Sequence, residues 1–203
     1  MSELLQLTFW ATFLSAAVRT AIPILCASIG EDISEKAGII NVGLEAVMLV
    51  GAFFGFAAAY LTHSLFWGFV VGMLAGMLLS LLHAFLSVYL KQDQNVAGVA
   101  LNLLATGLTS YIFQLMVNRY GIPQIETLKS VPIPLLSKIP LIGDALFNKD
   151  IVVYFSYLLV VFLVSYYKKT IWGMSLCAVG ENPRAADAVG ISVSTWQLPS
   201  MGC

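Results

Sequence analysis

Amide and hydroxyl side chains recur at every fourth position within one apolar stretch of the chain. The series, counted with its leading glycine, consists of Gly98, Asn102, Thr106, Ser110 and Gln114. In a helix, residues four apart lie on one slowly drifting face. These side chains can form hydrogen bonds without carrying a charge, which suits a solute that bears hydroxyl groups. Two roles are compatible with the pattern: a path for such a solute, or hydrogen bonds between packed membrane helices.

Two charged residues and a further amide stand inside apolar stretches near the start of the chain. Asn41 and Glu45 are again four residues apart, and Arg19 lies in the preceding stretch. At a helical rise of about 1.5 Å per residue, Arg19 and Glu45 would lie roughly 10 to 14 Å from the same membrane face. Because an isolated buried charge is costly, we predict that they form a structural ion pair. Contact of Asn41 and Glu45 with a solute is the alternative.

The other residues capable of chemistry do not form a catalytic or metal-binding pattern. His63 and His83 stand alone, without a serine, cysteine or carboxylate at a spacing typical of an active site. Cys26, Cys177 and Cys203 show no metal or redox spacing, and their odd number does not fit a disulfide framework. The sequence has no phosphate-binding Gly-Lys-Ser/Thr loop. We therefore expect this chain to be no enzyme and to hold no cofactor or metal.

The elements that carry these residues are long and apolar. Of the 203 residues, 59% are hydrophobic and 10% are charged, against about 25% charged in an average soluble domain. The mean hydropathy is +0.88. The net charge of −1 and the lack of a basic cluster argue against a nucleic-acid partner. Since about 20 apolar residues cross a bilayer as a helix, the sequence predicts an all-α, polytopic transmembrane bundle with the lipid bilayer as its solvent.

Five stretches qualify as membrane spans, at about 4–29, 39–61, 65–90, 96–117 and 151–167. The chain starts without a basic residue and with Glu3, so we predict a retained first helix rather than a cleaved signal peptide. In the third stretch, small residues at four-residue spacing predict a ridge for close helix packing. They are Gly68, Gly72, Gly76, Ser80 and Ala84.

Basic residues orient the spans only weakly. The loops after the first and third spans and the tail contain Lys36, Lys91, Lys168, Lys169 and Arg184. The long loop before the fifth span contains Arg119, Lys129, Lys138 and Lys149. Since cytoplasmic loops carry an excess of lysine and arginine, this small difference favours a cytoplasmic position for the first set.

The tail after the fifth span contains the signals of one short helix. Asn182 suits the N-cap, and Pro183 suits the first helical position. The alanines that follow favour helix, and Gly190 suits the residue just past its end. The predicted helix has about seven residues and a length of roughly 10 Å. Because so short a helix is marginal in water, we expect it to dock against its own bundle or against a partner protein.

Three segments resemble one family of transport proteins. Residues 180–191 read GENPRAADAVGI and resemble the cytoplasmic coupling motif of ATP-binding-cassette (ABC) importer permeases, which implies a coupling region at about 172–191. Residues 33–51 read ISEKAGIINVGLEAVMLVG, and residues 93–111 read DQNVAGVALNLLATGLTSY. Both are similar to the simple sugar and nucleoside branch, also described as branched-chain amino acid/ribose-type inner-membrane translocators. The short leading region looks more like the nucleoside-type members, and the resemblance extends from about Arg19 to Gly190.

The resemblance implies a permease subunit for a simple sugar or nucleoside, as a multi-pass protein of a bacterial plasma membrane. It implies three partners: an ABC ATPase subunit that hydrolyses the ATP, a second homologous permease and an external solute-binding protein. It also implies a set of ATPase-coupling residues. They are Gly180, Glu181, Asn182, Pro183, Arg184, Ala185, Ala186 and Gly190.

The chain departs from the family pattern at two points. Ala46 stands where family members usually have glycine. Similar permeases also continue for about a hundred residues with further spans, so we expect this chain to be a C-terminally truncated permease. An ion- or proton-coupled secondary transporter is the alternative function. That class often uses buried carboxylates, and Glu45 is the only acidic residue well inside a predicted span.

Overall fold

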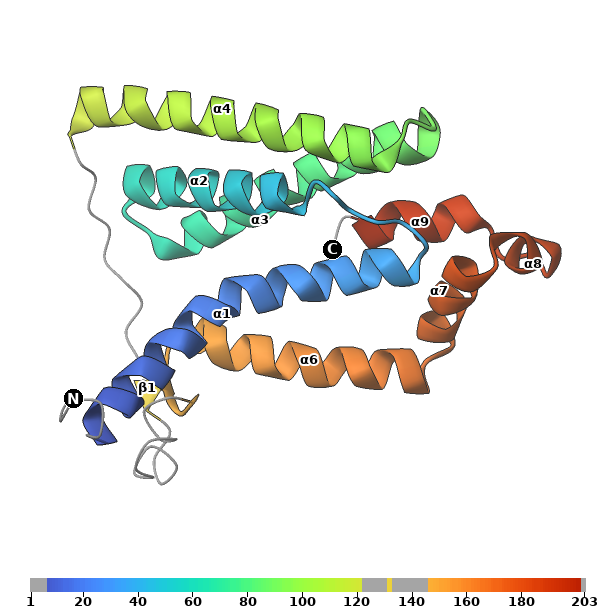
Figure 1. Ribbon diagram of the computed structural model, residues 1–203, viewed down its shortest axis with the longest axis horizontal. Coiled ribbons are helices and arrows are strands. Elements are labelled where there is room, and N and C mark those ends of the chain that lie inside the picture. The colour runs from blue at the N-terminus through green and yellow to red at the C-terminus, as the bar shows by residue number, and fades with distance from the viewer. Residues whose placement is uncertain (1–6, 122–130, 133–145, 202–203) are drawn as a thin grey trace. The chain divides into compact units, whose positions relative to one another are not determined.

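The computed structural model describes residues 7–121, 131–132 and 146–201, which are almost entirely helical (Figure 1). The long helices are α1 (Leu7–Lys36), α2 (Leu44–Thr62), α3 (Leu65–Ala84), α4 (Gln94–Tyr120) and α6 (Ile151–Lys169). The shorter elements are η2 (Phe85–Tyr89), α7 (Ile171–Glu181), α8 (Pro183–Ala188), α9 (Val193–Met201), β1 (Val131–Pro132) and β2 (Asn148–Lys149). Five of the described helices are long and apolar enough to cross a membrane, the third being α3 continued through η2. The predicted all-α, multi-span fold is confirmed.

The chain divides into two compact units. Unit 1 contains Met1–Ile29 and Glu126–Lys169, and unit 2 contains Gly30–Ile125 and Thr170–Cys203. Helix α1 begins in unit 1 and ends in unit 2.

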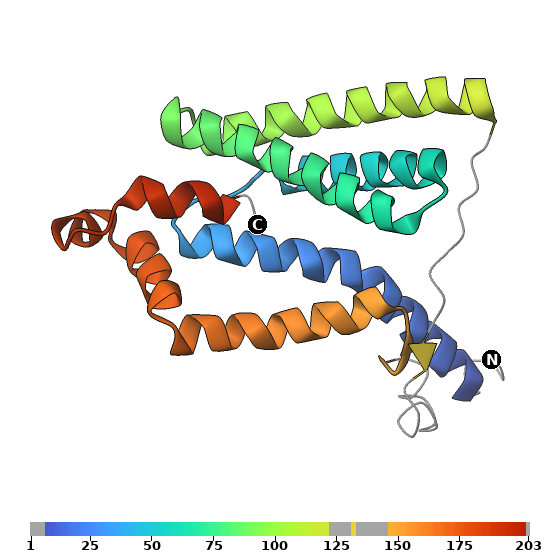
Figure 2. The same cartoon turned by 180° about the vertical axis from the view of Figure 1, so that it is seen from behind.

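The packing of α2 on α3 forms the centre of unit 2 and uses the predicted ridge of small residues. A Cβ built on Gly68 would lie 2.9 Å from the carbonyl oxygen of Gly55, and one on Gly72 would lie 2.8 Å from that of Gly51. Since real Cβ atoms do not approach so closely, only glycine permits this backbone contact, the arrangement expected of small residues in membrane helix pairs. Figure 2 shows α3 crossing α2 on the face turned toward the viewer.

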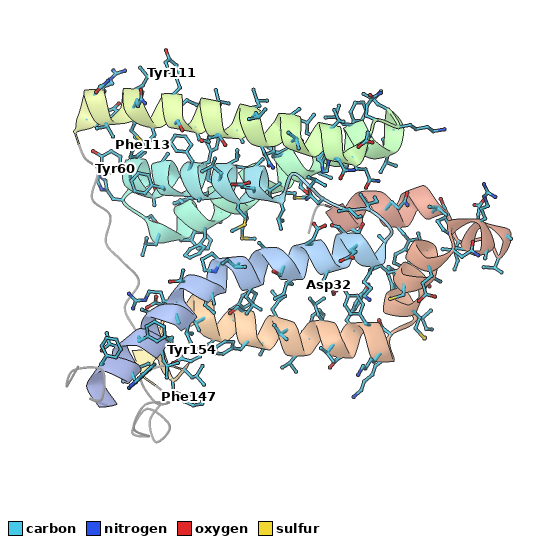
Figure 3. The ribbon with its side chains drawn as sticks, viewed as in Figure 1. Asp32, Tyr60, Tyr111, Phe113, Phe147 and Tyr154 are labelled. Carbon is cyan, nitrogen blue, oxygen red and sulfur yellow. The ribbon has the colours of Figure 1, made fainter. Side chains whose placement is uncertain are left out.

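Helix α4 covers another side of α2. Ala46 of α2 packs with Leu101 and Ala105 of α4 in one buried cluster. Farther along, the rings of Phe56 and Phe113 are 6.3 Å apart. Figure 3 shows Phe113 directed from α4 toward α2, whereas Tyr111 points away from it.

In unit 1, Lys149 of β2 connects several elements by hydrogen bonds, and it is only 1% exposed. Its ammonium group donates hydrogen bonds to the backbone carbonyl of Ser15 at 2.8 Å and to the hydroxyl of the same residue. The hydroxyl of Tyr154 donates to the Val131 carbonyl at 3.0 Å and accepts from the Lys149 N–H at 3.2 Å. Sheet β1–β2 and the start of α6 are thus tied to α1.

Three expected boundaries differ from the structure. The polar segment after Ile29 was expected to be a loop, but it continues α1 to Lys36. The second span was expected from residue 39, whereas α2 begins at Leu44. Helix α7 was not predicted. In the first and third cases the composition was misleading. A helix can continue beyond the apolar part that fills the membrane, and a helix of 11 residues is too short to be recognised as a span.

Candidate functional site

The 37–43 linker joins α1 to α2 and begins with a turn that requires glycine. Gly38 has a φ of 84°. Its N–H bonds to the carbonyl of Glu35 at 2.9 Å, and the N–H of Ile39 bonds to the carbonyl of Ser34 at 3.1 Å. These two bonds form a Schellman C-cap, in which the left-handed position favours glycine. The turn ends α1 and starts an irregular segment whose own polar groups need partners from elsewhere.

His83 of α3 supplies one of these partners from a fully buried position, with 0% of its surface exposed. Its Nδ1 lies 2.8 Å from the Oδ1 of Asn41, which also accepts the N–H of Gly43 at 3.1 Å. Its Nε2 lies 3.3 Å from the backbone oxygen of Gln94, the first residue of α4. A single imidazole therefore touches both the linker and the first turn of α4.

Further contacts fix the linker on two sides. The carboxylate of Glu31 accepts the N–H of Asn41 at 2.8 Å. The side-chain oxygen of Gln94 accepts the N–H of Ile40 at 3.1 Å. A Cβ added to Gly98 would lie 2.7 Å from the Cβ of Val42, so the linker lies directly on the backbone of α4 at that position. Glu31 of α1 and Gln94 of α4 thus hold the linker through its backbone N–H groups.

Asn102 caps α2 from the neighbouring helix. Gly43 occupies the N-cap position of α2 and has no side chain to satisfy the first N–H groups. The Oδ1 of Asn102 accepts the N–H of Ala46 at 2.8 Å, and its Nδ2 donates to the carbonyl of Val42 at 3.2 Å. The amide is thus hydrogen-bonded at one end by Ala46 in the first turn of α2 and at the other end by Val42 of the linker.

The α7–α8 segment meets the linker from the other side of unit 2. A Cβ on Gly180 would collide with the carbonyl oxygen of Lys36 and lie 3.0 Å from the N–H nitrogen of Gly38. Helix α9 adds two bonds, from the Gln197 amide to the carbonyl of Ala37 at 3.4 Å and from the Ser34 hydroxyl to the carbonyl of Ser200 at 3.2 Å. The two loops and the tail that were expected to share one membrane side therefore meet in space.

Helix α8 has the local structure that the sequence predicts. The Oδ1 of Asn182 accepts the N–H of Ala185 at 3.1 Å, and Pro183 opens the helix. Gly190 has a φ of 85° and follows the helix end. Its N–H bonds to Asp187 O, and that of Ile191 bonds to Ala186 O, both at 3.0 Å, which repeats the Schellman arrangement of Gly38.

Of the predicted coupling residues, two face inward and the rest are exposed. Ala186 is 4% exposed, and Gly180 lies against Lys36. The exposed members are Glu181, Asn182, Pro183, Arg184, Ala185 and Gly190. Val189 adds an apolar side chain that is 75% exposed. Helix α8 therefore packs against the rest of unit 2 with one side, and its other side is an exposed surface of polar and apolar residues.

The predicted polar face of α4 divides into two parts. Gly98 and Asn102 contact the linker and the start of α2, whereas Thr106, Ser110 and Gln114 are exposed. The Thr106 hydroxyl bonds to the carbonyl of Asn102 in its own helix at 2.8 Å. For Asn102 the structure thus shows a helix-to-helix contact. A role of the exposed three in a solute path stays a prediction.

The remaining candidates are placed as follows. Asn41 is buried and belongs to the linker contacts, and Glu45 is exposed at the start of α2. Arg19 belongs to unit 1 and Glu45 to unit 2, so the predicted ion pair stays a prediction. Sequence reasoning left His83 and Gln94 without a role. For Gln94, its position at the end of the short connection before α4 was the available signal, since a polar residue there can bond to a neighbouring loop. His83 lies inside α3, so its position gave no comparable signal.

Comparisons with known proteins place this arrangement in a family. The family described as "Branched-chain amino acid transport system / permease component" matches residues 13–202. A putative glucose ABC transporter permease of Haloferax volcanii is 39% identical over 191 residues, which are 92% of this chain and 57% of that protein. A nucleoside ABC transporter permease of Lactococcus lactis is 38% identical over 182 residues, 86% of this chain and 57% of that protein.

A guanosine ABC transporter permease of Bacillus subtilis is 34% identical over 207 residues, which cover 94% of this chain and 61% of that protein. The chain thus spans about three fifths of the length of these relatives. No solved structure matches it. With five apolar helices, the family match makes the chain a multi-pass protein of the plasma membrane.

Proposed function

Because the chain belongs to the branched-chain amino acid transport system permease family, we propose that it works as a permease subunit of an ABC importer. The observation that carries the proposal is the position of α8. This short capped helix is exposed on one side, while the α7 residue Gly180, three positions before it, touches the end of α1. A helix of six residues is too short to be stable alone, so its exposed surface is suited to a partner.

The proposed partners are an ABC ATPase on the cytoplasmic side, a second permease that completes the pore and an external solute-binding protein. In this scheme the ATPase contacts α8 through Arg184, Val189 and their exposed neighbours. Nucleotide binding then favours one arrangement of the bundle over another. The chain supplies the membrane part, and the hydrolysis of ATP belongs to the partner.

The proposed solute is a nucleoside or a simple sugar. The relatives are named for glucose, nucleosides and guanosine, which all carry several hydroxyl groups. Thr106, Ser110 and Gln114 are exposed on one side of α4 and can donate and accept hydrogen bonds with such a molecule. Asn102 is excluded from this set because the backbones of α2 and of the linker use both ends of its amide.

Copurification tests the docking of α8. The tagged chain is purified from the membranes of its own host, and we expect an ABC ATPase to accompany it. Arg184→Glu reverses an exposed charge on α8 and should lower the recovered ATPase at least fivefold, because like charges at an interface repel. Arg119→Glu is the matched control, since the same reversal falls near the far end of α4, about 37 Å from its start.

Equal recovery of the ATPase with Arg184→Glu and Arg119→Glu would contradict docking at α8. Absence of any ABC ATPase from the unaltered sample would contradict the importer assignment itself.

A further inference from the structure

We propose that the 37–43 linker is the relay between the α7–α8 segment and the polar face of α4, with His83 and Gln94 as its positioning residues. The inference rests on the proposed function, because it takes the movement of α8 by an ATPase as its input. It adds the route by which that movement reaches the helix whose exposed polar side chains could meet a solute.

The first step of the route is the contact between α7 and the linker. Gly180 lies so close to Lys36 and Gly38 that no side-chain carbon fits between the two backbones. The contact therefore has no flexible side chain that could absorb a displacement. Because close-packed protein interiors transmit strain rather than deform freely, a shift of α7 must displace the linker or break the contact.

The second step connects the linker to α4. Two bonds end on Gln94: Ile40 donates its N–H to the side chain at 3.1 Å, and the His83 Nε2 meets the backbone oxygen at 3.3 Å. The Nδ1 of His83 lies 2.8 Å from the Oδ1 of Asn41, so His83 also contacts the linker. Gln94 is the first residue of α4, so both contacts act on the end of a continuous 27-residue helix.

The third step is α4 itself. From Gln94 the helix runs without interruption through Asn102 to Thr106, Ser110 and Gln114. A rigid helix moved at one end carries its whole polar face with it, so the linker position sets the position of these side chains. This is the coupling of two sites through a contiguous packed element, for which mutations along the path typically change coupling two- to thirtyfold.

Helix α9 offers a competing route that the linker variants must distinguish. It contacts α7 and α8 at one end of the path and α3 and η2 at the other. Movement through α9 would bypass Gln94. A variant of Gln94 that removes only its side-chain bond to Ile40 leaves in place the α9 contacts and the linker contacts with Gly98 and Asn102. It therefore tests whether the movement enters α4 at Gln94.

The experiment measures how nucleotide changes the accessibility of α4 in the complex purified with its ATPase. Cys26, Cys177 and Cys203 are replaced by serine and Ser110 by cysteine, which places one thiol on the exposed face. The rate of its reaction with N-ethylmaleimide is measured without nucleotide and with ATP plus vanadate. The ratio of the two rates is the readout, and lower folded yield alone does not change a ratio taken within one sample.

Three variants test the relay against one control. Gln94→Met removes the bond to Ile40. His83→Asn keeps a donor near the Nδ1 position, and His83→Gln keeps one near the Nε2 position, so each retains one of the two contacts. His63→Asn makes the same chemical change in the turn after α2, where φ is 51° and asparagine is well tolerated. We expect the nucleotide effect to shrink at least threefold in the three variants and to persist in the control.

Each outcome decides a different point. If no ATPase accompanies the unaltered chain, the proposed function fails and the relay fails with it. If the ATPase is present and nucleotide does not change the labelling of position 110, the relay alone is wrong. If nucleotide changes the labelling equally in the unaltered chain and in Gln94→Met, the assignment of Gln94 as the positioning residue at which the movement enters α4 is wrong. Should the His83 variants fail to fold because they expose buried acceptors, the Gln94→Met result still decides the proposal.

Discussion

Replacement of Asn102 by leucine should destabilise the protein because it removes the contacts of the amide with Ala46 of α2 and with Val42 of the linker. The Ala46 N–H, now 2.8 Å from the Asn102 oxygen, and the Val42 carbonyl, now 3.2 Å from its nitrogen, would lose their partners. A buried polar group left unpaired costs about 1 to 3 kcal/mol. Hydrogen bonds between membrane helices average about 0.6 kcal/mol. Since Asn102 is only half-buried, we expect a loss of about 2 kcal/mol for the two groups together.

The assay is reversible unfolding in mixed micelles by titration with a denaturing detergent, followed by circular dichroism. When ionised, Asn102→Asp keeps the acceptor for the Ala46 N–H but loses the donor to the Val42 carbonyl, whereas its neutral form has an O–H that can still donate there. The neutral form should therefore be less destabilised than Asn102→Leu. Thr106→Val is the matched control one turn farther along. Within the described part of the chain its hydroxyl bonds only inside α4, so its effect should stay below about 0.5 kcal/mol.

The reasoning would be refuted if Asn102→Leu unfolded at the same detergent fraction as the unaltered protein. It would also be refuted if Thr106→Val were equally destabilising, because the loss would then reflect any polar deletion in α4 rather than the cap of α2.

Two further predictions concern other contacts. Gly180→Ala should cost about 1 to 3 kcal/mol in the same assay because its Cβ would collide with the Lys36 carbonyl. Gly107→Ala is the control: a Cβ there has nothing within 4 Å, so the change should be neutral or raise stability by up to about 1 kcal/mol. Equal effects of the two changes would contradict the close contact of α7 with the end of α1. For Arg19 and Glu45, a double-mutant cycle with alanine should give a coupling above about 0.5 kcal/mol if they pair, and simple addition of the two losses would contradict the ion pair.

Much of the local structure could be predicted from the sequence. Whether an apolar stretch is long enough to span a bilayer depends on that stretch alone and not on the helices packed against it. The five spans therefore follow from composition. The cap of α8 is also local, since Asn182, Pro183 and Gly190 act on backbone groups within a few residues. The ridge that includes Gly68 and Gly72 was visible from its spacing, although the sequence does not say which helix packs against it.

The contacts around the linker could not be predicted because they join residues far apart in the chain. Nothing near Gly43 indicates that α2 obtains its cap from Asn102, which lies 56 positions from the capped Ala46. Likewise, His83 and Asn41 are 42 positions apart. The polar spacing on α4 gave no means of separating Asn102, which bonds to α2, from Thr106, Ser110 and Gln114, which are exposed.

The sequence by itself therefore determined that this chain is a helical integral membrane protein, and its motifs indicated the family. These properties depend on hydrophobicity and on short-range backbone preferences, which each segment carries alone. Only the tertiary structure decided which polar side chains hold helices together and that the end of α1, the linker and α7 meet. Those contacts satisfy backbone groups that helix ends leave unpaired, and the partner that satisfies them is set by three-dimensional packing.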